Sequence, residues 1–227
     1  MQRPLEAFVF DAYGTLFDLQ SLVGLAETLA PRQGIALCQL WRTKQLEYTW
    51  LAALMATRSR PREDFAAITA HALDYAASAL IAPLESDAKR RLADAYTTLA
   101  PYADAYDVLA RLAPRPRVIL SNGTRAMLDP LVAASGLGAH LDAVISVDAA
   151  ATYKPHPAVY QLAVDRLRMP AERIGFVSAN GWDAAGAKAF GFTTFWINRL
   201  SVPVERHAPD PDYIVARLTD VALIAAS

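Results

Sequence analysis

The chain has 227 residues, 54% of them hydrophobic, and its 22 basic and 23 acidic side chains leave a formal net charge of −1. This length suffices for one large buried core, or for a core with a smaller insert. A near-neutral charge without a long basic run argues against nucleic acid or an anionic membrane surface as the main partner. The single cysteine, Cys38, excludes an internal disulfide framework and a cysteine-rich metal site. We find neither a signal peptide nor an apolar stretch of the roughly 18 residues that a membrane span needs, and therefore expect a cytoplasmic protein.

The first predicted element is a short buried strand at residues 7–10. It is an apolar run bounded within four residues by Gly14, which predicts a strand that ends in a sharp turn. Asp11 follows the strand directly. Ligands of open α/β sheets bind at the carboxyl ends of the strands. Asp11 is therefore either a cap for the next segment or a reactive group.

The following part of the chain, from about residue 16 to residue 98, has a helical pattern. Apolar side chains recur every three to four positions, and prolines separate the segments. Four helices are predicted, at residues 19–29, 37–56, 63–80 and 85–99. Because no clear strand interrupts them, we interpret residues 16–98 as an all-helical insert.

From Tyr102 onward, predicted strands and helices alternate. The strands are at residues 117–120, 143–146, 174–177, 193–197 and 213–215. The helices are at residues 103–112, 125–135, 157–167, 184–190 and 218–225. Alternation of this kind predicts the α/β class with a doubly wound, mostly parallel, Rossmann-like sheet. We assign residues 1–15 and 99–227 to this core domain.

Polar side chains follow several of the predicted strands. They are Asp11, then Ser121 and Asn122, then Ser178, Asn180 and Asp183. The ends of parallel strands share one edge of the sheet, so these side chains are expected to converge. Lys154 lies in a loop after another strand and could reach the same edge. Such a site could use a carboxylate as nucleophile, surrounded by hydroxyl, amide and ammonium groups.

Four segments together resemble the motifs of the haloacid dehalogenase superfamily of hydrolases. They are residues 11–15 (Asp-Ala-Tyr-Gly-Thr), residues 121–123 (Ser-Asn-Gly), the pair Lys154-Pro155, and the segment from Ser178 to Asp183. They occur in the order of that family and cover the whole predicted core. A helical cap inserted just after the first motif is also the arrangement of the family. The resemblance implies that Asp11 is the nucleophile.

The residue two positions after the nucleophile distinguishes branches of this superfamily. Phosphatases carry a second Asp there as general acid and base, whereas this chain has Tyr13. An oxygen leaving group needs a proton, but a halide ion leaves without one. Ser178-Ala179-Asn180 also stands where phosphatases tend to keep metal-binding carboxylates, which disfavours a Mg²⁺ site. The chain is thus similar to the L-specific (S)-2-haloacid dehalogenases, which implies a small 2-haloacid substrate and no metal or cofactor.

The insert carries a further part of this resemblance. Residues 40–50 are similar to the first long cap helix of those dehalogenases, which brings an arginine over the site, and Arg42 is the match. A guanidinium is a permanent cation with several donors, suited to a departing halide or a carboxylate. Without the resemblance, a solvent-facing arginine would be the simpler interpretation.

The resemblance implies a two-step displacement. Ionised Asp11 attacks C2 of a 2-haloalkanoate with inversion and expels halide, and water then hydrolyses the ester. Lys154 would keep the carboxylate ionised and offset its repulsion of the anionic substrate. Arg42 and Asn122 would cradle the halide.

The remaining site residues are also assigned by resemblance. Ser121 would bind the substrate carboxylate, helped by backbone amides near Tyr13 and Leu16. Thr15 and Ser178 would orient Asp11 and Lys154, and Asn180 and Asp183 would position or activate the water. The apolar wall would consist of Tyr13, Leu46, Phe65 and Trp182. Thr15 and Ser178 as turn residues, Phe65 as core packing and Asp183 as a helix cap are the alternatives.

Two other functions stay open from the sequence. One is a Mg²⁺-dependent small-molecule phosphatase of the same superfamily, which would need another acid in place of Tyr13. The other is a non-catalytic binding protein on the same fold, because fold alone does not determine function. The apolar faces of the cap helices, with Tyr48, Trp50, Leu54 and Met55, also suggest a homodimer formed through the cap.

Overall fold

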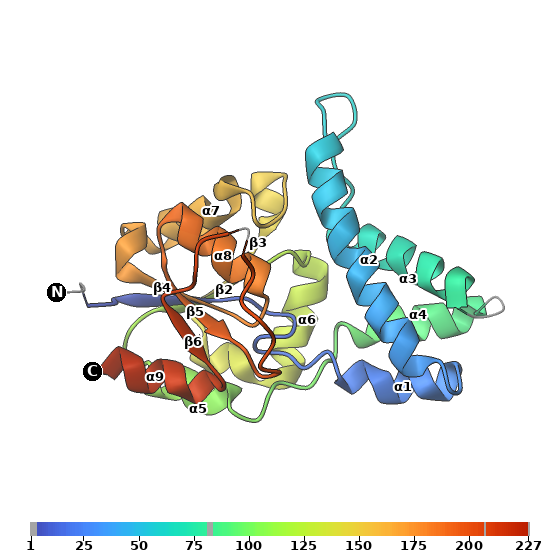
Figure 1. Ribbon diagram of the computed structural model, residues 1–227, viewed down its shortest axis with the longest axis horizontal. Coiled ribbons are helices and arrows are strands. Elements are labelled where there is room, and N and C mark those ends of the chain that lie inside the picture. Colours follow the sequence, from blue (N-terminus) through green and yellow to red (C-terminus); the bar gives the residue numbers. More distant parts are fainter. Residues whose placement is uncertain (1–3, 81–83, 207, 227) are drawn as a thin grey trace.

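A parallel sheet forms the centre of the computed structural model, which describes residues 4–80, 84–206 and 208–226. In the described residues the sheet has six strands in the order β3-β2-β1-β4-β5-β6, and every neighbouring pair is parallel (Figure 1). They are β1 (Ala7–Phe10), β2 (Arg117–Ser121), β3 (Ala143–Ser146), β4 (Ile174–Ser178), β5 (Thr193–Ile197) and β6 (Tyr213–Val215). The predicted α/β class with a doubly wound sheet is confirmed.

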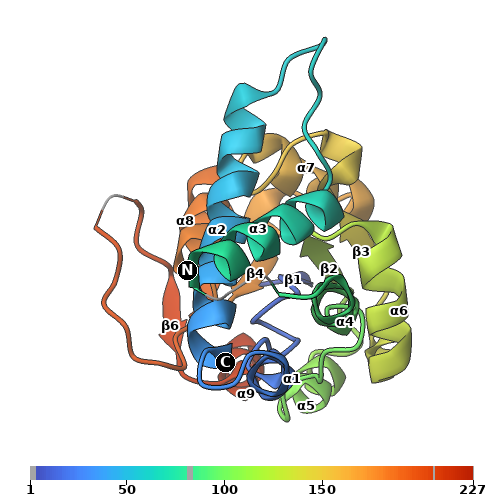
Figure 2. The same ribbon diagram turned by 90° about the vertical axis from the view of Figure 1, so that its right-hand side faces the viewer.

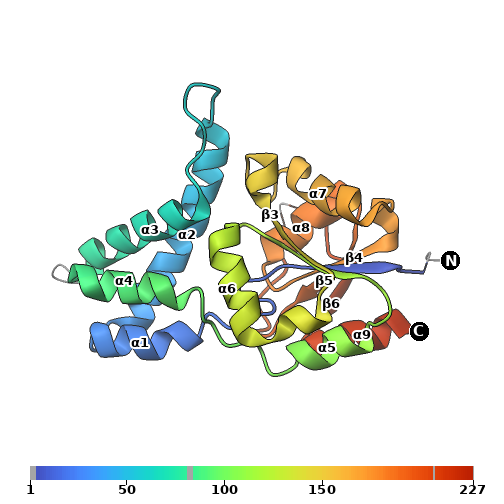
Figure 3. The same cartoon turned by 180° about the vertical axis from the view of Figure 1, so that it is seen from behind.

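Helices cover both faces of this sheet. α7 and α8 lie on one face, and α5 and α9 lie on the other (Figures 1 and 3). The core helices are α5 (Ala105–Arg111), α6 (Arg125–Ser135), α7 (Pro157–Leu167), α8 (Gly181–Phe190) and α9 (Leu218–Ala226). Because both faces are covered, the central strands are mainly apolar, and all residues of β1 and β4 are buried.

The strand order creates a crevice at the functional edge. From β1 the chain moves outward to β2 and β3, and then crosses back to place β4 on the other side of β1. The loops after β1 and β4 therefore leave the sheet in opposite directions. Ligands of doubly wound sheets bind at such a switch point. Asp11 follows β1 and Asn180 follows β4, so both lie at this crevice.

A second group of helices lies beside the carboxyl edge of the sheet. It consists of α1 (Ser21–Leu29), α2 (Gly34–Met55), α3 (Phe65–Leu80) and α4 (Ser86–Ala95). Figure 2, viewed from this side, shows α2 running across in front of the sheet. Buried polar contacts join α2 to α3, where Trp41 Nε1 and Gln45 Nε2 donate to the backbone oxygen and the hydroxyl of Thr69. No helix in the described ranges has both the length and the apolar character needed to cross a bilayer.

Several element ends differ from the sequence-based expectation. α8 begins at Gly181 rather than residue 184, and α2 begins at Gly34 rather than residue 37. Gly34 and Ala36 in one first turn, and Gly181 and Asp183 in the other, interrupt the apolar periodicity on which the prediction relied. An acidic residue is favourable in a first turn, where it meets the positive end of the helix dipole. The shift in α8 matters because it places Asp183 on the helix, at a fixed orientation to the sheet.

Candidate active site

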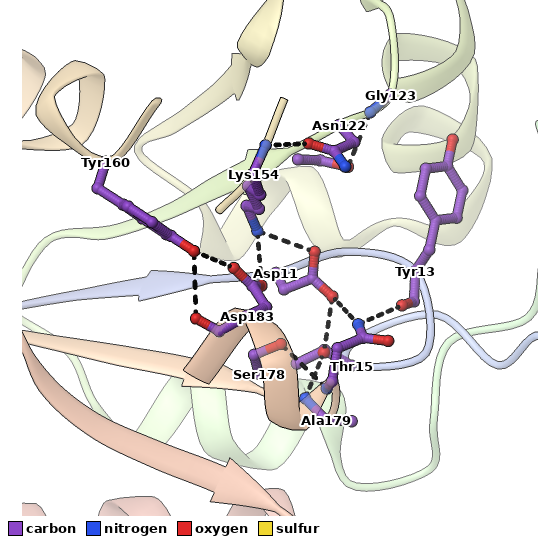
Figure 4. A network of polar contacts seen from close by, with 12 residues as sticks. Asp11, Tyr13, Thr15, Asn122, Gly123, Lys154, Tyr160, Ser178, Ala179 and Asp183 are labelled. Carbon is purple, nitrogen blue, oxygen red and sulfur yellow. Dashed lines mark hydrogen bonds and ion pairs between the residues drawn. The ribbon is translucent and has the colours of Figure 1, made fainter. Parts of the chain in front are cut away.

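Asp11 is the centre of a buried polar network (Figure 4). Its Oδ2 accepts hydrogen bonds from Thr15 Oγ1 at 3.0 Å and from Asn180 Nδ2 at 2.9 Å. Its Oδ1 faces Lys154 Nζ at 3.1 Å. Only 6% of Asp11 is exposed, so these donors take the place of water around the carboxylate. They fix both oxygens in direction, as an attacking group requires.

A tight turn brings Thr15 back onto Asp11. Gly14 has a φ of 85°, a left-handed conformation that glycine adopts without steric cost. Three successive amide groups, those of residues 15–17, then donate to the single carbonyl of Ala12. The Thr15 hydroxyl also accepts from the Ala179 amide at 2.8 Å, which joins the loops after β1 and β4.

Lys154 lies between two carboxylates. Its Nζ is 3.1 Å from Asp11 Oδ1 and 2.9 Å from Asp183 Oδ2, and the residue is 1% exposed. Burial alone would lower the pKa of Lys154, but the charges and hydrogen bonds of the two carboxylates outweigh it and raise that pKa. The group therefore stays an ammonium at neutral pH, with a single positive charge shared between two negative ones.

Asp183 is held by groups from three directions. It lies in the first turn of α8, Lys154 faces Oδ2, and the Tyr160 hydroxyl donates to Oδ1 at 2.9 Å. Complete burial raises the pKa of Asp183, while Lys154 and Tyr160 oppose that rise. Tyr160 itself remains protonated, because burial and then the charge of Asp183 raise its pKa well above the usual value.

A glycine makes the contact between Tyr160 and α8 possible. A Cβ on Gly186 would lie 2.5 Å from Pro155 Cβ and 2.6 Å from the Tyr160 hydroxyl. Both distances are too short for any other residue to fit without movement. Gly186 follows Asp183 by three positions on α8, so it permits the approach that delivers the hydroxyl to Asp183.

Ser121, the last residue of β2, and Asn122, the first residue after it, complete the part of the site that the sheet domain contributes. Asn122 Oδ1 accepts from the Lys154 amide at 3.1 Å, and this bond ties the loop after β2 to the lysine loop. The Ser121 hydroxyl accepts from the Gly123 amide at 3.2 Å, so its own hydrogen is free to be donated elsewhere. Both side chains are buried beside the network.

Ser178 has a different contact from the one expected by resemblance. Its hydroxyl accepts from the Asn180 amide at 3.1 Å and thereby shapes the turn after β4. The contact with Lys154 is made by Asp11 and Asp183. In this arrangement Ser178 acts on the network through Asn180, whose side-chain amide binds Asp11.

α2 and α3 supply the opposite wall. Arg42 Nη2 lies 3.4 Å from Asn180 Oδ1, and Arg42 Nη1 donates to Gln45 Oε1 at 2.7 Å. The ring of Phe65 stacks on that of Tyr13 with centroids 5.9 Å apart. The Tyr13 hydroxyl is buried without a hydrogen-bond partner among the described residues, so Tyr13 brings a polar atom to a wall predicted as apolar.

The other residues predicted for the wall lie in different places. Leu46 is half-buried on α2, one turn after Arg42 and hence on the same side of the helix. Trp182 is half-buried in the first turn of α8 and packs edge-on against Trp50 of α2. Leu16 is fully buried, and its amide donates to Ala12, so the backbone donor expected there is already engaged.

Sequence reasoning missed Tyr160 and Arg199. Tyr160 lies inside α7, where nothing in an apolar helical pattern marks it as functional. Arg199 follows β5 at the same sheet edge and could have been found by the strand-end argument. Its two guanidinium Nη atoms donate to the carbonyls of Gly14 and Thr15, both at 3.0 Å, and its charge lies 3.7 Å from the centre of the Tyr102 ring.

The donor set fits a cation poorly. The two carboxylates of the network both face the Lys154 ammonium, and the described residues contain no cluster of three histidine, cysteine or acidic side chains. A divalent ion between these carboxylates would have to displace the buried ammonium that already pairs with both of them. Asn180, an amide, stands on the remaining side.

A buried aspartate at the switch point of a doubly wound sheet is the arrangement described above. The family model of the haloacid dehalogenase-like hydrolases matches residues 5–191, and the chain belongs to that family. The chain is 47% identical to an (S)-2-haloacid dehalogenase of Xanthobacter autotrophicus over 87% of its own length and 76% of that protein. It is 40% identical to an (S)-2-haloacid dehalogenase of Pseudomonas putida over 97% and 96% of the two chains.

A solved structure shows the same similarity over the whole fold. The L-2-haloacid dehalogenase of Xanthobacter autotrophicus with chloropropionic acid covalently bound superposes with a TM-score of 0.91 at 41% identity. The match covers 98% of this chain and 99% of the other. That protein forms a covalent adduct with its haloacid.

Proposed function

We propose that this protein hydrolyses short (S)-2-haloalkanoic acids to (R)-2-hydroxyalkanoic acids and halide through an ester on Asp11. The observation that carries the proposal is the state of Asp11, which is buried, held by three donors and followed two positions later by Tyr13. Position 13 therefore lacks a second carboxyl group that could protonate an oxygen leaving group. The similarity to a relative with chloropropionic acid covalently bound supports the same conclusion.

In the first step, one oxygen of Asp11 forms a bond to C2 of the substrate while the carbon–halide bond breaks. The halide leaves with the bonding electrons, and the configuration at C2 inverts. Arg42 and Asn122 would receive the halide, and the free hydrogen of Ser121 would be donated to the substrate carboxylate. Lys154 offsets the repulsion between that carboxylate and Asp11.

In the second step, water attacks Cγ of the ester. Asp183 would accept the proton of the water, and the breaking bond is the one between Cγ and the oxygen bound to C2. That oxygen leaves as the hydroxyl of the product after taking up a proton, and Asp11 regains an oxygen from water. One proton is released to solvent. Asn180 would position the water, because its amide bridges Asp11 and Arg42.

The helical unit α1–α4 supplies one wall of this site, and we propose residues 16–98 as a cap on a core of residues 1–15 and 99–227. Two linkers join the parts side by side, with the Asp18 amide donating to Ala100 and the Tyr102 amide donating to Leu16. Arg42 crosses from this unit to Asn180 of the core. Closure over the substrate would exclude water during the first step.

We also propose a homodimer formed through α2, in a cytoplasmic protein. Leu54 is 83% exposed and Met55 56% exposed at the end of this helix, and Leu51 is also exposed. Adjacent apolar side chains in water favour association. Light scattering should give twice the mass of one chain, and a monomer would refute the dimer.

The proposed cytoplasmic location rests on a different observation. A free thiol at Cys38 suits a reducing compartment.

The experiment that tests the function is halide release from the separate enantiomers of 2-chloropropionate, with and without EDTA. We expect release from the (S) form only, unaffected by EDTA, and absent in Asp11→Asn. Mass spectrometry of acid-quenched enzyme should find the substrate, less its halide, on the peptide that contains Asp11. No halide from either enantiomer or from haloacetates would refute this activity.

A further inference from the structure

A cavity of about 310 Å³ lies between α1 and the first half of α2, outside the network around Asp11. Its outer side chains are exposed and include Ile35, Gln39 and Thr43. Its inner side chains are buried, as Trp41 and Tyr96 show. The cavity thus has an exposed rim and a buried floor.

The charge that lines this cavity is positive. Of the described residues that line it, Arg42 alone carries a charge, and no carboxylate is among them. Leu22, Val23 and Cys38 form much of the apolar wall. A cation beside an apolar wall suits a small amphiphilic anion, with its carboxylate on the guanidinium and its alkyl part against the wall.

The cavity and the catalytic network share a wall. Arg42 lines the cavity and also contacts Asn180, which binds Asp11. Tyr96 lines the cavity and packs against Tyr13 with ring centroids 5.5 Å apart. Leu19 is a third shared member, since a Cβ on Gly14 would lie 3.8 Å from Leu19 Cδ1.

The reacting groups are buried behind this wall. Asp11 is 6% exposed and Lys154 1% exposed, so a substrate has to pass protein atoms before it meets the nucleophile. We propose that the cavity is a vestibule that binds the 2-haloalkanoate by its carboxylate at Arg42 before the substrate reaches Asp11. This inference rests on the proposed function, which defines a substrate with one carboxylate and a short apolar chain.

The single cysteine allows the vestibule to be probed without turnover. Cys38 lines the cavity, and burial raises its pKa to about 11, so thiol labelling is slow and rates must be compared as ratios. The probes are an anionic methanethiosulfonate, the sulfonatoethyl reagent, and the cationic trimethylammonioethyl reagent. Each rate is divided by the rate of the same reagent with a free thiol.

We expect the anionic reagent to label Cys38 about tenfold faster than the cationic one after this correction. Arg42→Gln should remove the preference, and propionate should protect Cys38 in the wild type but not in that variant. A cationic reagent that labels as fast, or a preference that survives Arg42→Gln, overturns the vestibule. This readout does not depend on dehalogenation.

A kinetic test blocks the cavity and leaves the catalytic network unchanged. Cys38→Trp fills the vestibule, and Cys38→Ala is the matched control that leaves it open. We expect kcat/KM for (S)-2-chloropropionate to fall at least tenfold in Cys38→Trp with a much smaller change in kcat, and Cys38→Ala to match the wild type. An unchanged kcat/KM in folded Cys38→Trp, or a loss confined to kcat, refutes the vestibule. Absence of halide release in the wild type would instead refute the proposed function.

Discussion

The Tyr160 hydroxyl donates a 2.9 Å hydrogen bond to Oδ1 of Asp183, and both groups are completely buried. Lys154 holds the other oxygen of the same carboxylate. Because a phenol bonds more strongly to an ionised carboxylate than to a neutral carboxyl group, this bond stabilises the charged state that Asp183 needs for its proposed role as proton acceptor.

Tyr160→Phe is therefore expected to impair the second step. Loss of the donor raises the pKa of Asp183 further above its usual value, so the acid limb of kcat moves to higher pH. A hydrogen bond to a charged group is worth about 1.5–3 kcal/mol, which corresponds to a fall of about tenfold or more in kcat. Halide release across pH, with rapid-quench measurement of the ester, checks this result. The ester should accumulate, and a variant with wild-type kcat and pH profile would contradict the assigned role.

Lys154→Met should damage both stability and activity. It leaves Asp11 and Asp183 buried without the cation that they share, and removal of one partner from a buried ion pair costs about 3–5 kcal/mol. Urea denaturation at neutral pH measures the loss. Lys154→Arg is the matched variant, which keeps the charge but has a larger, planar head, so it should retain more stability than activity. A Met variant as stable as the wild type would contradict this account of the network.

Metal removal is expected to leave the activity unchanged. Lys154 occupies the place between the two carboxylates that a divalent ion would need. Excess EDTA should not lower halide release, and Mg²⁺ should not raise the melting temperature of the wild type. Lys154→Met provides the contrast, because removal of the ammonium exposes both carboxylates to Mg²⁺ and should make its melting temperature rise on addition of the ion. EDTA-sensitive activity that Mg²⁺ restores would contradict the prediction.

Arg199→Met should loosen the loop after β1 (residues 11–17), which carries the proposed nucleophile, without touching Asp11 itself. The guanidinium donates to Gly14 and Thr15 and stacks on Tyr102. Two hydrogen bonds from a charged group and one cation–π contact together predict a loss of at least about 3 kcal/mol in the free energy of unfolding. We also expect kcat to fall more than KM rises, because Thr15 orients Asp11.

Arg199→Lys separates charge from geometry at the same position. A single ammonium cannot reach both carbonyls in the forked arrangement of a guanidinium, so it should restore only part of the stability and of kcat. Thermal unfolding and steady-state kinetics measure the two effects. Full recovery by lysine would show that the charge, and not the paired contacts, supports the loop.

The sequence predicted the strands and the polar groups at their ends because one physical rule governs both. A parallel sheet with covered faces needs continuous apolar strands, and the polar residues that terminate them gather at one edge. Asp11, Asn180 and Asp183 follow from that rule. The position of Lys154 between Asp11 and Asp183 does not, because it depends on how a loop folds back over the edge.

Tyr160 lay beyond the reach of sequence reasoning for a related reason. Its contact with Asp183 depends on the distance between α7 and α8, which Gly186 sets through the absence of a side chain. A helical pattern reports which face is buried but not how closely two helices approach. The start of α8 was misplaced for the same kind of reason, since Asn180, Gly181 and Asp183 do not belong to an apolar repeat.

The stack of Arg199 on Tyr102 has a consequence for the dynamics of the protein. Tyr102 belongs to the returning linker of the helical unit, and the same guanidinium holds the carbonyls of Gly14 and Thr15 in the nucleophile loop. Opening of the linker breaks the cation–π contact and opening of the loop breaks the two hydrogen bonds, so one side chain couples the two segments. We expect them to unfold locally as one unit, with amide protons that exchange with solvent at similar rates. We therefore expect that a movement of the helical unit away from the sheet would also loosen the turn that carries Asp11.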